Sequence, residues 1–377
     1  MTDTFLRQIL SVFSFMMLSQ VWGYSQENVN FQWINPVDDP RIIFYGQGWD
    51  HSRLKSPYDR LPSEAEENVR EPVWGLSRHT AGIYLRFSTD ADEILIRYQA
   101  NSRYQMPHMP ATGVSGLDMY VKSSEESWVW CRGKYAFNDT ITYRYSNLNS
   151  RNPDSGAREY NLYLPLYNSV KWMEIGIPEA GSLLMPSTEE EKPILVYGTS
   201  IAQGGCASRP AMGWTNIVQR HLDRPVINLA FSGNGRLEEE VIAYIEEVDA
   251  GLYILDCLPN LGNKETYTDE ELKRRIEQSV RTLRNSHPET PILLASHAGY
   301  SDDQVNQNAF ESVERVNRIL EESFHSLKKD QINHLYLLHS DEINMCMDCT
   351  VDGTHQTDLG MQFYADAYLK KIREILR

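Results

Sequence analysis

The second half of the chain alternates short apolar runs with amphipathic segments, and this alternation restricts the possible folds more than any other feature of the sequence. The apolar runs cover residues 194–198, 225–231, 252–258, 291–298 and 334–340. Helical patterns separate them, and the pattern at 269–286 is opened by a capping box from Thr268 to Glu271. Strands that alternate with helices need crossover connections, which make the strands parallel. We therefore predict a three-layer α/β sandwich with about five parallel strands.

The first half has a different rhythm, with short runs in which apolar and polar residues alternate. These runs cover residues 82–88, 93–99, 117–123, 160–167 and 170–177. Such a pattern predicts an antiparallel, all-β sandwich. The stretch 178–192 has no period and ends in an acidic run, so we interpret it as a linker. The 377 residues are therefore predicted to form a β-sandwich domain at 26–177 and an α/β domain at 193–377.

The N-terminus carries an apolar stretch that follows Arg7 and is too short to span a bilayer securely. The small residues Gly23 and Ser25 come after it, so residues 1–25 are predicted to be a secretory signal peptide rather than a buried helix. No later stretch of the sequence is long and apolar enough to be a membrane span. We expect a secreted or periplasmic protein.

Charge and cysteine content restrict the partners and cofactors. A net charge of −16 would repel a nucleic-acid backbone and gives no long-range attraction to anionic membranes. Five cysteines in an exported chain leave at least one thiol unpaired within a monomer. Cys346 and Cys349 form a CxxC near His355, but no second pair of ligands stands at a matching spacing, so a local disulfide or two thiols are favoured over zinc. No metal or organic cofactor is implied.

One serine is placed just after the first predicted strand of the second half, in the segment VYGTSIAQGG. Gly204 and Gly205 follow Ser200 and permit backbone conformations that other residues disfavour. Such a turn can hold a hydroxyl in a cleft or simply connect a strand to a helix. In open parallel sheets, sites form outside the carboxyl ends of the strands. Three more segments follow strands at that edge: AFSGNG, DCLPNL and VDGTH.

These segments carry the groups that acyl transfer needs. Ser200 is the predicted nucleophile, His355 the base that takes its proton, and Asp352 the group that orients and stabilises the imidazolium. The backbone N–H groups of Ser200 and Gly233 and the side-chain amide of Asn260 are predicted to form an oxyanion hole. Each segment alone is typical of a polar turn, so the hypothesis depends on all of them meeting at one edge of one sheet.

With these segments the second domain resembles the SGNH subgroup of the GDSL lipase/acylhydrolase family. The matching blocks, in order over residues 193–377, are YGTSIAQGG, NLAFSGNG, DCLPNL and DGTHQTDLG. Thr199 stands where the GDS signature has aspartate, and Gln356 stands where proline often follows the histidine. The resemblance implies a flavodoxin-like α/β/α hydrolase domain.

The first half carries a second resemblance. The segment ATGVSGLDMYVK at 111–122 is similar to the Gly-x-Asp-Leu-Tyr motif of the β-domain that precedes some bacterial SGNH hydrolases, with Met119 in place of leucine. The plan also resembles two-domain carbohydrate esterases, which implies a jelly-roll-like sandwich. The turn-rich loop at 106–113 carries His108 and is a candidate to reach the hydrolase cleft.

We therefore expect a secreted serine esterase that hydrolyses short acyl esters, acetyl esters in particular, of a carbohydrate. The reaction is expected to pass through an acyl-enzyme intermediate. The polar stretch 206–209 after Ser200 favours short acyl chains. The alternative is a lipase or thioesterase for longer chains, and it is disfavoured because the sequence has no amphipathic lid near Ser200. A second alternative is a carbohydrate-binding protein with an inert hydrolase domain. It would stack sugars on aromatic residues such as Trp128, Trp130, Tyr143 and Tyr145.

Overall fold

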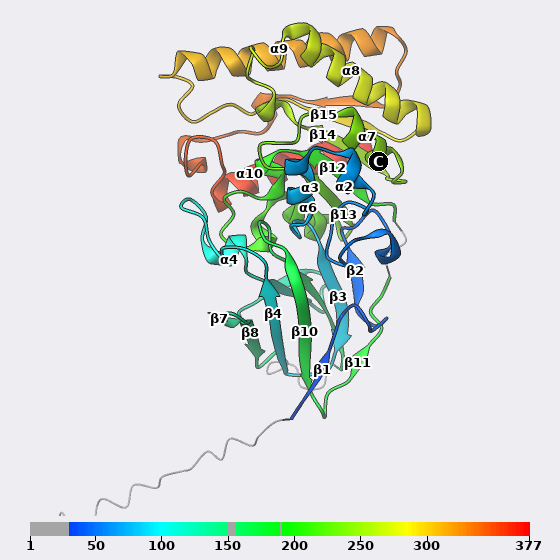
Figure 1. The fold of residues 1–377 in the computed structure, drawn as a ribbon, viewed down its shortest axis with the longest axis vertical. Coiled ribbons are helices and arrows are strands. Elements are labelled where there is room, and N and C mark those ends of the chain that lie inside the picture. Colours follow the sequence, from blue (N-terminus) through cyan, green and yellow to red (C-terminus); the bar gives the residue numbers. More distant parts are fainter. Residues whose placement is uncertain (1–29, 149–155, 189–190) are drawn as a thin grey trace, which may run out of the picture.

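The computed structural model describes residues 30–148, 156–188 and 191–377. A β-sandwich and an α/β domain are stacked along the long axis of the molecule (Figure 1). The predicted signal peptide at 1–25 lies outside the described residues. Among the helices of these described ranges, none combines the length and the hydropathy that a membrane span requires.

Five strands form the sheet of the α/β domain. They are β12 (Ile194–Gly198), β13 (Val226–Ala230), β14 (Leu252–Asp256), β15 (Ile292–Ala295) and β16 (Leu335–Leu338). Each lies within one of the predicted apolar runs, and all pairings are parallel in the order β13-β12-β14-β15-β16. Numbered along the chain this is the order 2-1-3-4-5 of flavodoxin-like folds. The predicted α/β fold is confirmed.

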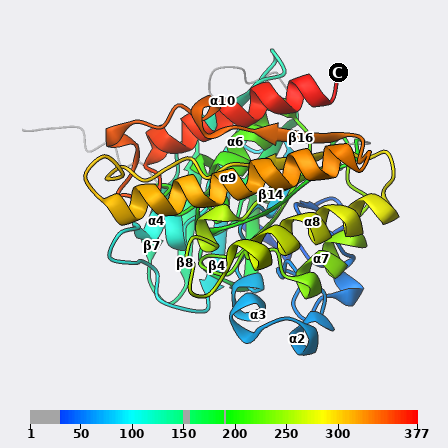
Figure 2. The same ribbon diagram turned by 90° about the horizontal axis from the view of Figure 1, so that it is seen from above.

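Helices cover both faces of this sheet (Figure 2). They are α5 (Ser200–Gln203), α6 (Trp214–Leu222), α7 (Glu239–Glu246), α8 (Asp269–Ser286), α9 (Gln307–Lys329) and α10 (Asp358–Ile375), with the 3₁₀ turns η2 (Pro210–Met212), η3 (Leu258–Asn260), η4 (Ser340–Glu342) and η5 (Met347–Cys349). Helices α6 and α10 share one apolar core with the sheet, and α7, α8 and α9 share the other. At the start of α8, Oγ1 of Thr268 accepts the backbone N–H of Glu271 at 3.3 Å, as the capping pattern predicts.

Two antiparallel sheets form the β-sandwich. Their strands are β1 (Phe31–Ile34), β2 (Ile43–Tyr45), β3 (Tyr84–Thr89), β4 (Glu93–Ala100), β5 (Asp118–Lys122), β6 (Trp128–Cys131), β7 (Lys134–Phe137), β8 (Ile141–Ser146), β9 (Arg158–Tyr163), β10 (Val170–Pro178) and β11 (Leu183–Leu184). One sheet has the order β1-β10-β4-β8-β7, and the other has the order β11-β3-β9-β5-β6 with β2 beside β3. The alternation in β4 places Ile94, Ile96 and Tyr98 in the core. The predicted sandwich is confirmed, although β1, β2, β6, β7, β8 and β11 lie outside the runs that the sequence indicated. Strand β11 lies within the stretch 178–192 that the sequence indicated as a linker, and it pairs with β3.

The segment between β2 and β3 packs on the α/β domain. It contains η1 (His51–Arg53), α2 (Ala65–Asn68) and α3 (Glu71–Ser77), and Figure 1 shows α2 and α3 next to the strands of the α/β domain. Trp49, Leu61 and Val73 are buried in the same core as α7 and α8. From the end of the sandwich, Leu166 and Tyr167 enter the core of α6 and α10. The packing therefore crosses the border between the two predicted domains.

Arg60 is the clearest polar contact across this border. Its side chain is fully buried, and Nη1 donates to the carbonyl oxygens of Asn228 at 2.9 Å and Ala230 at 2.8 Å. These carbonyls belong to β13, which is an edge strand. Burial lowers the pKa of Arg60 to about 9, but the guanidinium remains charged at neutral pH. Arg60 thus satisfies polar backbone groups that an open sheet edge would leave unpaired.

We expect residues 190–377 without the first half to lose stable folding. The truncation removes several buried apolar side chains from both cores of the α/β domain, and the burial of each contributes about 2 kcal/mol. Their summed contribution is comparable with the free energy of unfolding of a typical domain. Circular dichroism and thermal unfolding of 190–377 and of 30–377 measure the effect. Cooperative unfolding of the fragment at the temperature of the longer chain would contradict it.

Candidate active site

Ser200 lies at the carboxyl end of β12, which runs between β13 and β14. The strand ends at Gly198, Thr199 occupies the N-cap position and Ser200 begins the single turn of α5. Gly204 ends this turn with a φ of +106°, and a Cβ there would lie 2.8 Å from Leu166. Glycine is the residue that tolerates both conditions. The turn after β12 thus holds the Ser200 hydroxyl at the edge of the sheet.

A chain of hydrogen bonds joins Ser200, His355 and Asp352. Nε2 of His355 lies 2.8 Å from Oγ of Ser200, and Nδ1 lies 2.8 Å from Oδ2 of Asp352. Because the carboxylate only accepts, Nδ1 carries the proton and Nε2 accepts the serine O–H. Oδ1 of Asp352 also accepts the backbone N–H groups of Thr354 at 3.1 Å and His355 at 2.8 Å. The structure brings together the three residues for which the sequence predicts catalytic roles.

These contacts keep Asp352 ionised. Partial burial opposes the charge, but the backbone N–H and ring of His355 and the backbone N–H of Thr354 outweigh it, so the pKa of Asp352 falls below its usual value. A carboxylate at this position is able to stabilise positive charge on the imidazole.

Gly233 and Asn260 lie in the loops that follow the two strands beside β12. Gly233 has a φ of +67°, faces open space, and its N–H has no acceptor among the described residues. Nδ2 of Asn260 donates to the carbonyl oxygen of Gly235 at 3.2 Å. An amide nitrogen carries two hydrogens, so this bond orients the side chain and leaves one donor available. Both predicted oxyanion-hole groups are therefore at the same sheet edge as Ser200.

The loops that carry Ser200 and His355 are tied to each other. The backbone N–H of Ser208 lies 2.8 Å from Oδ1 of Asp358, and its Oγ lies 2.5 Å from Oδ2. Asp358 begins α10, three residues after His355. Because Ser208 follows Ser200 closely in the chain, this carboxylate restrains the distance between the two loops.

Asp118, in the Gly-x-Asp motif, ties the same segment to the β-sandwich. Its buried carboxylate forms an ion pair with Arg209, accepts Nε1–H of Trp130 at 2.6 Å and accepts the backbone N–H of Ala211 at 3.3 Å. Burial raises the pKa of Asp118, while Arg209 and Trp130 act in the opposite direction. The polar side chains of Ser208 and Arg209 are thus engaged in holding the loop.

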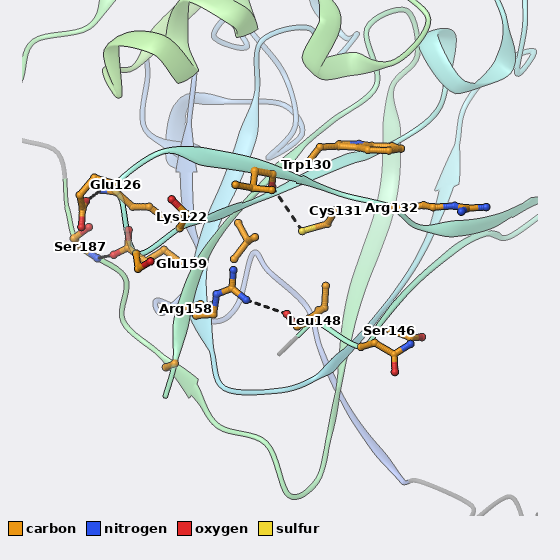
Figure 3. Close-up of a pocket in the computed structure, with 16 residues that line it drawn as sticks. Lys122, Glu126, Trp130, Cys131, Arg132, Ser146, Leu148, Arg158, Glu159 and Ser187 are labelled. Carbon is orange, nitrogen blue, oxygen red and sulfur yellow. Dashed lines mark hydrogen bonds and ion pairs between the residues drawn. The ribbon is translucent and has the colours of Figure 1, made fainter. Parts of the chain in front are cut away.

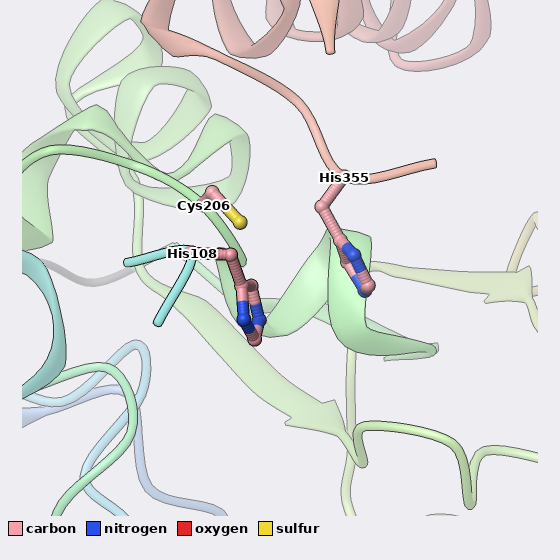
Figure 4. A group of neighbouring side chains, drawn as sticks. All are labelled: His108, Cys206 and His355. Atoms are coloured by element: carbon pink, nitrogen blue, oxygen red, sulfur yellow. The ribbon is translucent and has the colours of Figure 1, made fainter. Parts of the chain in front are cut away.

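Two further side chains lie beside His355 (Figure 4), and one of them is on the loop that the sequence made a candidate to reach the cleft. The ring centre of His108, on the loop before α4 (Ala111–Val114), is 5.7 Å from that of His355. The prediction that this loop reaches the cleft is confirmed. Cys206 is buried, and its burial, with a smaller contribution from Asp352, raises the pKa of the thiol to about 12. A neutral thiol does not compete with Ser200 as a nucleophile. No motif in the sequence marked Cys206.

A hollow of about 1000 Å³ lies in the β-sandwich (Figure 3). Residues of β5, β6 and the adjoining segments line it, among them Lys122, Trp130 and Arg158. None of its lining residues belongs to the hydrogen-bonded group around Ser200. The hollow is therefore separate from the candidate active site.

Family comparisons agree with the fold and the site. Residues 191–373 match the model of the GDSL-like lipase/acylhydrolase family, and residues 31–183 match the GxDLY model, which describes the N-terminus of SGNH hydrolase-type esterases. Fold and matches define a two-domain ester hydrolase of the SGNH type. The α/β domain belongs to the GDSL-like lipase/acylhydrolase family, as the motifs predicted. Among curated proteins, none matches the chain.

Several solved structures are similar to this chain over both of its domains. A GDSL-like lipase from Bacteroides ovatus is 29% identical with a TM-score of 0.82, over 92% of this chain and 98% of its own. The salicylyl-acyltransferase SsfX3 from a tetracycline biosynthetic pathway is 18% identical with a TM-score of 0.72, over 92% and 97%. A family two carbohydrate esterase from Clostridium thermocellum, solved with cellohexaose, is 11% identical with a TM-score of 0.57, over 89% and 99%. The last two likenesses concern the fold alone.

Asp256 is a buried carboxyl at the end of the strand next to β12. It ends β14 opposite Gly198, and its Oδ2 has no hydrogen-bond partner among the described residues. Burial raises the pKa of Asp256 from 3.8 to about 7, against a smaller opposing effect of Tyr368. The folded state therefore holds the carboxyl proton of Asp256 more tightly than the unfolded state does. The contribution of this proton to the free energy of unfolding is fully present below pH 3.8 and is lost as the pH rises through about 7.

We expect Asp256→Asn to gain stability relative to the unsubstituted chain as the pH rises from roughly 5 to 8, by about 1–3 kcal/mol, because the amide cannot ionise. Urea unfolding at both pH values measures the difference. Asp366→Asn, on the exposed side of α10, is the matched control and should show no such trend. An Asp256→Asn difference that is equal at both pH values would contradict the assignment.

Proposed function

We propose that the chain is a secreted serine esterase that hydrolyses short acyl esters, acetyl esters in particular, on a carbohydrate. The observation that carries this proposal is the continuous set of hydrogen bonds from Ser200 through His355 to Asp352. Such a set activates a serine hydroxyl as a nucleophile. It agrees with the ester-hydrolase class that the family matches assign.

In the first half-reaction, Oγ of Ser200 attacks the ester carbonyl carbon while Nε2 of His355 takes the hydroxyl proton and Asp352 stabilises the imidazolium. Negative charge on the carbonyl oxygen is accepted by the N–H groups of Ser200 and Gly233 and by Nδ2 of Asn260. When the tetrahedral intermediate collapses, the ester C–O bond breaks. His355 returns its proton to the departing alcohol, and the acyl group stays on Ser200.

In the second half-reaction a water molecule takes the place of the alcohol. Nε2 of His355 removes a proton from the water, and the hydroxide oxygen attacks the acyl carbon with the same oxyanion donors in place. The bond to Oγ of Ser200 then breaks and His355 reprotonates the serine. The products are the free acid and the regenerated enzyme, and no cofactor is needed.

A small acyl group fits the burial of the nucleophile. Ser200 is only 8% exposed, so a carbonyl carbon must enter a narrow space to reach Oγ. A short chain meets this condition better than a long one. This supports an esterase for short chains over the alternative of a lipase or thioesterase.

The acceptor side is proposed to be a carbohydrate because the chain shares its two-domain plan with the carbohydrate esterase solved with cellohexaose. The alternative of a binding protein with an inert hydrolase domain has less support. Tyr143 and Tyr145 are buried in the sandwich and cannot stack on a sugar. Trp130 is about half exposed, but it bonds to Asp118 and lies against the Arg209 guanidinium. Export is proposed from the signal-like sequence at 1–25.

We expect Ser200→Ala and His355→Ala each to abolish most turnover, and the double variant to be scarcely worse, because the two groups act as a unit. Asp352→Asn should retain more activity than either. Asn260→Ala should lower kcat about 100-fold with little change in KM, because the lost bond forms mainly in the transition state. Steady-state kinetics on p-nitrophenyl acetate, with folding checked by circular dichroism, provide the test.

Asn308→Ala, at an exposed position of α9, is the matched control for the asparagine variant and should keep full activity. A folded Ser200→Ala protein with near-native activity would refute the whole assignment. An Asn260→Ala effect confined to KM would refute only the oxyanion role.

We also expect the rate to fall as the acyl chain lengthens from acetate to decanoate, because Ser200 is buried. Hydrolysis of a p-nitrophenyl ester series measures this dependence. An acetate-release screen across acetylated polysaccharides and oligosaccharides then tests the acceptor. A rate that increases toward decanoate would favour the lipase.

A further inference from the structure

Three side chains with metal-binding donor atoms meet beside Ser200. They are His108, Cys206 and His355, and their ligand atoms all lie within 4.8 Å of one another. Figure 4 shows that they come from three separate segments of the chain. His108 is exposed, His355 is partly exposed and Cys206 is buried. An ion from solvent would therefore meet the histidines first and the thiol behind them.

Two of these donors have no other task in the structure. Within residues 30–148, 156–188 and 191–377, neither the His108 ring nor the Cys206 thiol makes a hydrogen bond. The other two free thiols do: Sγ of Cys131 lies 3.9 Å from the carbonyl oxygen of Val129, and Sγ of Cys257 lies 3.5 Å from that of Tyr197. Among the free thiols of the described residues, Cys206 is thus the one without a hydrogen-bond partner.

The third donor is already oriented for coordination. Nδ1 of His355 is bonded to Asp352, so Nε2 is the ring nitrogen with an available lone pair. A carboxylate behind a histidine is the usual support of a metal-bound imidazole, because it fixes the tautomer and raises the basicity of the ligand. Cys346 and Cys349, the nearby CxxC, form a disulfide and supply no thiolate.

We propose that His108, Cys206 and His355 form an inhibitory binding site for Zn²⁺. Two imidazole nitrogens and a thiolate suit this ion, with water in the fourth position. Tetrahedral coordination places donors about 3.5 Å apart, so the site must contract by about 1 Å. His108 is the exposed donor, so its side chain has the most room to rotate toward the other two. The Sγ–H bond of Cys206 breaks, its proton passes to solvent and an Sγ–Zn bond forms without any change of oxidation state.

Occupancy of this site removes the proposed general base. The lone pair on Nε2 of His355 cannot bind Zn²⁺ and accept the Ser200 proton at the same time. Zn²⁺ therefore competes directly with the hydrogen bond on which the proposed reaction depends. The inhibitory effect rests on the proposed esterase function, whereas the binding of the ion does not.

Binding is tested first, without any use of activity. Co²⁺ is added to the full chain carrying Ser200→Ala, and thiolate-to-cobalt charge-transfer absorption is recorded. We expect one equivalent of Co²⁺ to produce this band, and Cys206→Ser in the same background to abolish it. Absence of the band in the Ser200→Ala chain would overturn the site, whether or not the protein is an esterase.

Inhibition is tested by Zn²⁺ titration of p-nitrophenyl acetate hydrolysis, with each variant scaled to its own zinc-free rate. We expect inhibition that a chelator reverses, and a Zn²⁺ concentration for half-inhibition that rises at least tenfold in His108→Ala and in Cys206→Ser. His325→Ala, an exposed histidine on α9, is the control and should match the unsubstituted chain. Equal inhibition of every variant would overturn the proposal, as would binding of Co²⁺ without inhibition by Zn²⁺. Because His108 is exposed, its variant remains informative if Cys206→Ser does not fold.

Discussion

The structure depends on the parallel pairing of β12 with β13 on one side and β14 on the other. Gly198 lies opposite both Ala230 and Asp256, so the three strands end at the same level. The loops that follow them carry Ser200 and the two other proposed oxyanion donors. A shift of one residue in either pairing would move a loop by about 3.3 Å, which exceeds the tolerance of a hydrogen bond. Backbone pairing in the sheet thus fixes the distances that acyl transfer requires.

The β-sandwich half completes the α/β domain in three physical ways. Apolar side chains such as Trp49 enter its core, Arg60 satisfies the open edge of β13, and Asp118 holds the segment after Ser200 through Arg209. A fourth contribution, His108, stands at the site itself. Apolar packing, hydrogen bonds and an ion pair therefore join the two halves, and Asp118 of the Gly-x-Asp motif anchors the segment 206–211 that follows Ser200.

Much of the fold was predictable because it follows from local patterns. Continuous apolar runs between amphipathic helices specify a parallel sheet that is covered on both faces, and this is what the structure contains. Strands β6 and β7 escaped recognition because they lack a regular alternation, as in β7, where three of four residues are exposed. Strand β8 alternates regularly between buried and exposed residues, so the period-2 pattern was present there and was overlooked. The packing of α2 and α3 on the α/β domain was also missed, since a short helix gives no indication of its distant partner.

The sequence alone determined the turn after β12 and the compact Asp352–His355 pair, because both depend on backbone preferences and on residues a few positions apart. It also indicated that their loops meet at one edge, since parallel strands leave no other arrangement. The sequence made the His108 loop a candidate to reach the cleft, but only the tertiary structure placed the His108 ring and Cys206 beside His355. It also placed Arg60 against the edge of β13. Those contacts join segments far apart in the chain, and they are decided by how two packed domains fit together, which no local pattern encodes.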